Sequence, residues 1–97
     1  MNIEEAQSLV FDAIRAVNGE RGVDEQILLL PTTALFGHDS TVDSLSLVSL
    51  VVDVETALSE KLGRQISLTD EVAMSREVMP LATVGTLTEF IIELAQH

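Results

Sequence analysis

Cysteine, tryptophan and tyrosine are absent from this 97-residue sequence, and its aromatic residues are three phenylalanines. Without cysteine the chain has neither a disulfide framework nor a thiol nucleophile. Because aromatics are so few, the 46% of residues that are hydrophobic are mainly Leu, Val, Ile and Ala. Such a core suits small packed helices better than a β-sandwich. We therefore expect an all-α fold, and the length predicts a single domain over residues 1–97.

Basic residues are also scarce, with five Lys and Arg against sixteen Asp and Glu, which gives a formal net charge of −11. Binding to nucleic acid needs Lys and Arg to neutralise phosphates, so we expect no nucleic-acid partner for a chain with this charge balance. It favours protein partners with basic docking surfaces, which reach the chain by electrostatic steering.

Long apolar runs are missing, and the segment from Met1 to Glu5 holds two acids and no basic residue. This pattern predicts neither a secretory signal nor a membrane-spanning segment, so we expect no membrane partner. The expected location is the cytoplasm, and the expected state is a monomer.

Helical periodicity appears in three long segments. The first covers about residues 3–17, with Asn2 as the predicted N-cap, Glu5 completing a capping box, and Asn18-Gly19 as the stop. The second covers residues 44–62 and ends at Gly63. The last covers residues 84–95 with Thr83 as its cap. A short helical turn is expected near residues 68–74, and Pro80 prevents it from continuing into the last helix.

The loop between the first two helices, residues 19–43, is long and unusually apolar. It contains Ile27-Leu28-Leu29-Leu30 as well as Leu35 and Phe36. A loop of this composition is not a solvated linker, so we expect it to lie against the helices and close one side of the core.

The helix expected over residues 44–62 sorts its side chains into three arcs at 100° per residue. The arc that should face the core contains Leu47, Leu50, Val51, Val54 and Leu58. A polar arc contains Ser46, Ser49, Asp53, Thr56 and Glu60. The third arc, Leu45, Val48 and Val52, is apolar but off-centre from the core. It either packs under the long loop or forms an exposed strip for a docking partner.

The beginning of this helix and the segment before it contain Leu35-Phe36-Gly37, then Val42-Asp43-Ser44-Leu45, then Val48 and Leu50. Together with the helix order, length and acidity of nearly the whole chain, these residues resemble the acyl carrier protein family. The resemblance implies a four-helix bundle with three longer helices, a short third helix and a long loop between helices 1 and 2. It also implies that Asp43, Ser44 and Leu45 form the attachment motif, with a phosphopantetheinyl transferase moving 4'-phosphopantetheine from coenzyme A onto Ser44.

Under this resemblance the chain is not an enzyme but a carrier that holds acyl groups as thioesters and presents them to acyl-processing enzymes. These enzymes would dock on Leu45, Val48 and Val52, and on the carboxylates of Asp53, Glu55 and Glu60. The chemistry of the residues agrees, because the unpaired N–H groups and positive dipole end of a helix start favour an attached phosphate. A helix cap is the plainer role for Ser44, and Asp43 is equally suited to that role. Ser46 and Ser49 lack the preceding Asp and are not favoured as attachment sites.

One residue departs from the family pattern. Many fatty-acid carriers have Glu five residues after the attachment serine, where this chain has Ser49. The thinner acidic face favours a specialised carrier for lipid or polyketide-type products, while the cargo itself stays open. The alternatives are an aminoacyl or peptidyl carrier, or an unmodified acidic adaptor that binds a basic protein. His38 and His97 have no metal-ligand spacing, so no metal site is expected.

Overall fold

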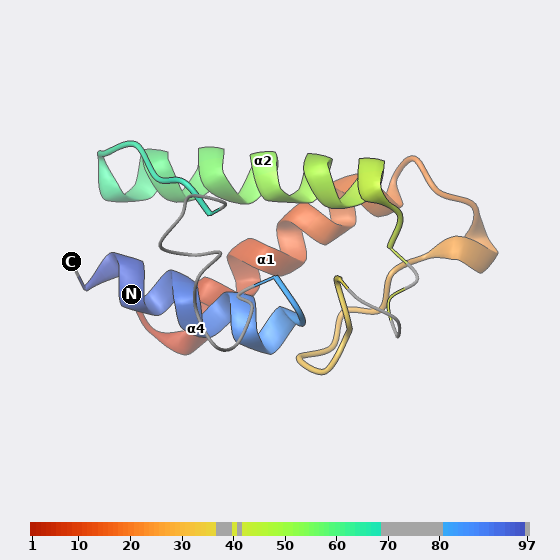
Figure 1. Ribbon diagram of the computed structural model, residues 1–97, viewed down its shortest axis with the longest axis horizontal. Coiled ribbons are helices and arrows are strands. Elements are labelled where there is room, and N and C mark those ends of the chain that lie inside the picture. Colours follow the sequence, from red (N-terminus) through yellow and green to blue (C-terminus); the bar gives the residue numbers. More distant parts are fainter. Residues whose placement is uncertain (37–39, 41, 69–80, 97) are drawn as a thin grey trace.

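The computed structural model is all-helical in the residues it describes, which are 1–36, 40, 42–68 and 81–96, with only the backbone of Ser44 (Figure 1). Its elements are α1 (Ile3–Asn18), the short 3-10 helix η1 (Val23–Glu25), α2 (Ser44–Leu62) and α4 (Val84–Ala95). The three long helices confirm the prediction within one residue at each end. The short helix expected near residues 68–74 falls, apart from Leu68, outside the described residues, so the four-helix count stays a prediction.

Helix α1 begins and ends where its capping residues predict. The Asn2 side chain accepts a hydrogen bond from the Glu5 amide at 2.8 Å, and the Glu5 carboxylate accepts one from the Asn2 amide, which completes the capping box. Its buried face consists of Ala6, Val10, Ala13, Ile14 and Val17. Helical periodicity also predicts Ile3 on this face, but Ile3, the first residue of the helix, is 61% exposed.

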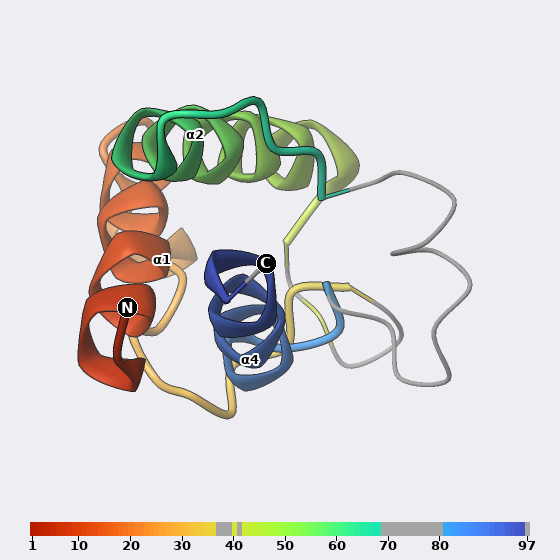
Figure 2. The same ribbon diagram turned by 90° about the vertical axis from the view of Figure 1, so that its left-hand side faces the viewer.

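Helix α1 packs against both of the other long helices (Figure 2). Four of the five residues predicted to face the core from α2 are buried, namely Leu50, Val51, Val54 and Leu58, and the fifth, Leu47, is partly buried. Helix α4 contributes Val84, Leu87, Phe90 and Ile91. An ion pair of 3.0 Å between Lys61 and Glu5 joins the end of α2 to the start of α1. The helices therefore enclose one aliphatic core.

The long loop is anchored to the helices at two places. Near α1, the side chain of Asn18 makes two hydrogen bonds with the backbone of Ile27, at 2.7 and 3.0 Å. Near α4, an isolated antiparallel bridge joins Ala34 to Thr83. Ile27 and Leu35 are buried, as expected of a loop that closes the core. Other apolar residues of the loop are not buried. Leu28, Leu30 and Phe36 are each about half exposed or more.

In the part of the chain that the structure describes, no helix is both long enough and apolar enough to cross a membrane.

Candidate functional site

The first turn of α2 is capped by Asp43. Its carboxylate accepts a hydrogen bond from the Ser46 amide at 2.8 Å, and its carbonyl accepts one from the Leu47 amide at 2.9 Å. Ser44 is the first residue of the helix. Of the two capping candidates that the sequence offered, Asp43 is therefore the N-cap, and the cap does not depend on the Ser44 hydroxyl.

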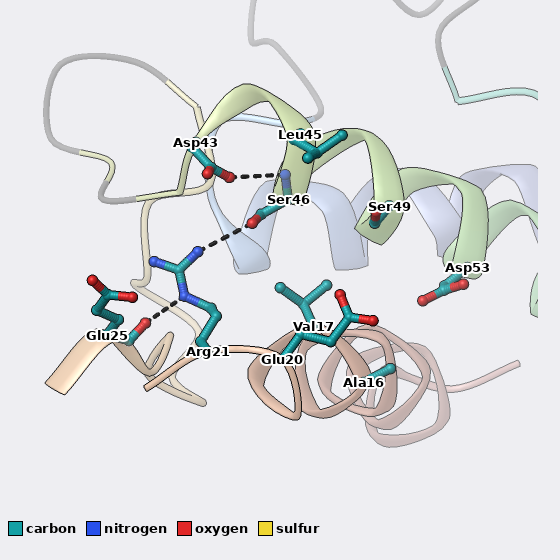
Figure 3. A pocket seen from close by; sticks show the side chains of 10 residues that line it. All are labelled: Ala16, Val17, Glu20, Arg21, Glu25, Asp43, Leu45, Ser46, Ser49 and Asp53. Carbon is teal, nitrogen blue, oxygen red and sulfur yellow. Dashed lines mark hydrogen bonds between the residues drawn. The ribbon is translucent and has the colours of Figure 1, made fainter. Parts of the chain in front are cut away.

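Arg21 lies beside this turn, although it precedes it by 25 residues (Figure 3). Its guanidinium donates to the Ser46 hydroxyl at 3.1 Å through Nη1 and to the Glu25 carbonyl through Nε. Arg21 thus ties the η1 segment to the start of α2. The sequence did not point to this residue, since nothing in its local pattern shows which distant turn it reaches.

The surroundings of Asp43 stabilise its charged form. Hydrogen bonds from the Ser46 side chain and amide lower the pKa of Asp43 below its ordinary value of 3.8, and the positive charge of Arg21 adds to this effect. Asp43 is exposed, so the surrounding water weakens these interactions. The carboxylate stays ionised at neutral pH and holds the first turn in place.

The third arc of α2 is exposed. Leu45, Val48 and Val52 are 77%, 59% and 53% accessible. This confirms that the arc is exposed rather than packed beneath the long loop, while its role in docking stays a prediction. Of the polar arc, Ser49, Asp53, Thr56 and Glu60 are exposed, and Ser46 is half-buried because Arg21 covers it. We call Leu45, Val48 and Val52 the apolar strip.

Glu55 has a role that the sequence did not reveal. It is half-buried, and its carboxylate accepts a hydrogen bond from the Leu68 amide at 3.1 Å. The carboxylate therefore helps to hold the segment that follows α2 against the helix. Glu55 is less available for docking than the expectation of an open acidic face supposed, whereas Asp53 and Glu60 remain exposed.

Two of the depressions formed by the described residues lie next to the apolar strip of α2. A polar groove of about 550 Å³ separates α2 from the end of α1 and the turn after it (Figure 3). Its walls include Glu20 and Arg21 on one side and Leu45, Ser49 and Asp53 on the other. A second, apolar hollow of about 320 Å³ is lined by Leu47, Val48, Val51, Val52, Glu55 and Leu81. The strip thus borders both depressions.

No metal centre is found among the described residues, where no three His, Cys, Asp or Glu side chains come together suitably. The two histidines, His38 and His97, lie outside those residues, so this part of the expectation is not tested by the structure.

Comparisons of this chain with protein-family models, with curated proteins and with solved structures found no match.

Proposed function

We propose that this chain is a carrier protein of the acyl carrier type, with Ser44 as the attachment residue for 4'-phosphopantetheine and a four-helix fold completed by the short helix expected near residues 68–74. The observation that carries the proposal is the arrangement at the start of α2. An Asp-Ser-Leu sequence opens the helix, the Asp is its cap, and the Leu begins a strip of exposed apolar side chains. Such a strip, next to carboxylates, suits a protein that binds to other proteins.

Several residues around Ser44 fit an attached phosphate. The first amides of α2 carry the positive end of its dipole, and Arg21 adds a full positive charge nearby. Because Asp43 caps the helix, esterifying the Ser44 hydroxyl leaves the cap intact. The attached arm supplies a thiol that holds cargo as a thioester. The role of the chain itself is to present Ser44 on a rigid helix and to offer the surface that partners recognise.

Attachment is the transfer of the phosphopantetheinyl group of coenzyme A to Ser44, catalysed by a separate transferase. The Ser44 oxygen forms a bond to the β-phosphorus of coenzyme A, and the bond from that phosphorus to the bridging oxygen breaks. Adenosine 3',5'-bisphosphate leaves, and the Ser44 proton passes to a base of the transferase. The partner enzymes that follow would approach the apolar strip together with the exposed carboxylates of Asp53 and Glu60.

The proposal is tested by intact mass after coexpression with a broad-specificity phosphopantetheinyl transferase. We expect the wild-type chain to gain one phosphopantetheine unit and Ser44→Ala to gain none. Because Asp43 supplies the cap, Ser44→Ala should lower the free energy of unfolding by less than about 1 kcal/mol, the usual cost of losing a helix cap.

Two results would contradict the proposal. If wild type gains no mass, the carrier function fails, and an adaptor that uses the same strip without modification becomes the better interpretation. If Ser44→Ala still gains the unit, the assignment to Ser44 is wrong. Ser49→Ala is the matched control, since Ser49 lies on the same helix and should be dispensable for attachment.

A further inference from the structure

We infer that the polar groove between α1 and α2 receives a basic side chain of the partner protein that docks on the apolar strip. The groove thereby fixes how that partner is oriented on α2. This inference rests on the proposed function and extends it, because it brings Glu20, in the turn after α1, into a docking surface so far confined to α2.

Two carboxylates lie on opposite walls of the groove. Glu20 extends from the turn after α1, Asp53 extends from α2, and both line the same space (Figure 3). Both residues are exposed, and within the described part of the chain neither carboxylate has a hydrogen-bond or ion-pair partner. A single cationic group between them would interact with both, whereas an anion would be repelled by both.

The end of α1 adds to the preference for a cation. The helix terminates at Asn18 with Gly19 as its C-cap, beside the groove wall formed by Ala16, Val17 and Glu20. The last carbonyls of a helix carry about half a negative charge. Arg15, the basic residue of that last turn, pairs with Asp12 at 2.6 Å and does not line the groove. The dipole of α1 therefore adds to the negative charge of Glu20 on this wall of the groove.

Arg21 also lines the groove, but its guanidinium does not pair with the carboxylates of Glu20 and Asp53. Arg21 lies at the other end, where it donates to the Ser46 hydroxyl and to the Glu25 carbonyl. Its charge acts on Asp43 next to Ser44. The groove is thus polarised along its length, with Arg21 beside Asp43 and Ser46 and the carboxylates of Glu20 and Asp53 farther along α2 (Figure 3).

A protein is the occupant because the groove continues into the apolar strip. Leu45 is both the most exposed member of that strip and part of the groove wall. A small cation would leave Leu45 in water, whereas a protein surface with one Lys or Arg beside an apolar contact covers both. The polarity of the groove then permits one orientation, in which the basic side chain lies over Glu20 and Asp53.

The test measures how the rate of modification depends on carrier concentration, using a broad-specificity phosphopantetheinyl transferase and coenzyme A. The groove variant is Glu20→Gln with Asp53→Asn, which keeps side-chain shape and removes two charges. The matched control is Glu4→Gln with Glu89→Gln, two exposed residues on α1 and α4 that lie outside this groove. Both variants have the same net charge, so the long-range electrostatic attraction of the transferase is the same for the two.

We expect the groove variant to raise KM at low salt by about 3- to 10-fold with kcat unchanged, as the loss of two exposed charge pairs predicts, and the control by less than about 2-fold. At high salt the difference should disappear. Equal KM values for the two variants, with wild type modified normally, would overturn the inference and leave the carrier function intact. A wild-type chain that is never modified would overturn both.

Discussion

At the scale of single residues, the start of α2 assigns the helix cap to one residue and leaves the proposed attachment to the next. Asp43 holds the helix end, and Ser44 follows as the first helical residue. The N–H groups at a helix start need an acceptor, and a carboxylate meets this need better than a hydroxyl that is to be esterified. The Asp of the Asp-Ser-Leu sequence thus has a physical reason to precede the proposed attachment residue.

This division predicts how Asp43 variants behave. Asp43→Ala should lower the melting temperature by roughly 4–8 °C, the effect of losing one helix cap in a domain of this size. Asp43→Asn keeps an accepting oxygen and should lower it less. Thermal unfolding followed by circular dichroism measures both. Equal losses for the two variants would mean that charge, rather than the hydrogen bond to Ser46, holds the turn.

The same cap has a pH dependence whose direction follows from its pKa. The pKa of Asp43 is lowered in the folded state, so its contribution to stability is complete above the unfolded value of 3.8 and is lost as pH falls through the folded value. The protection factor of the Ser46 amide, which is its exchange rate corrected for the intrinsic rate at each pH, should therefore fall as pH drops below 3.8 in wild type and depend less on pH in Asp43→Asn.

At the scale of elements, the helices could be predicted from the sequence because their signals are local. Asn2, Thr83 and Gly63 each determine an end of a helix through contacts within a few residues. Gly63 adopts a φ of 69°, which favours glycine, and its amide bonds to the Ser59 carbonyl. Periodicity then identifies the buried face of each helix, and this needs no knowledge of the neighbouring elements.

The contacts between elements could not be predicted, since they join residues far apart in the chain. Arg21 reaches Ser46, and the Glu55 carboxylate reaches the Leu68 amide. No periodicity encodes either pair. In the long loop, Ile27 is buried while its neighbour Leu28 is exposed. That choice depends on where Asn18 holds the backbone of Ile27, which is a tertiary property.

The exposed strip of α2 leads to a prediction for that element. Val48→Asp should weaken binding of acyl-processing enzymes by about 10-fold or more, because it places a charge at the apolar centre of the interface. It should leave the melting temperature within a few degrees of wild type, since Val48 is 59% exposed. Val51→Asp is the contrasting variant, as Val51 is buried and the fold itself should fail. If Val48→Asp bound partners normally, the strip would have no part in docking.

At the scale of the whole molecule, the net charge of −11 acts on every encounter with a partner. The acidic residues are not confined to the candidate site, since Glu4, Asp12 and Glu89 are exposed on α1 and α4. General attraction of a basic partner therefore comes from the entire surface, whereas a preferred docking position needs a local arrangement of charge. Only a comparison at constant net charge separates these two contributions.

Two double variants with the same net charge, studied at low and high salt, provide that comparison for the polar arc of α2. We expect association with basic partners to slow sharply as ionic strength rises, because the Debye length falls from about 10 Å at 0.1 M to about 3 Å at 1 M. Asp53→Lys with Glu60→Lys should slow association at low salt to nearly the high-salt rate, while Glu4→Lys with Glu89→Lys, which changes net charge equally, should slow it much less. Stopped-flow association rates measure both. Since each exposed pair contributes only about 0–1 kcal/mol, the effect should appear in the association rate more than in the dissociation rate. Equal slowing by both double variants would mean that total charge alone attracts partners and that the arc containing Asp53 and Glu60 has no special part in the encounter.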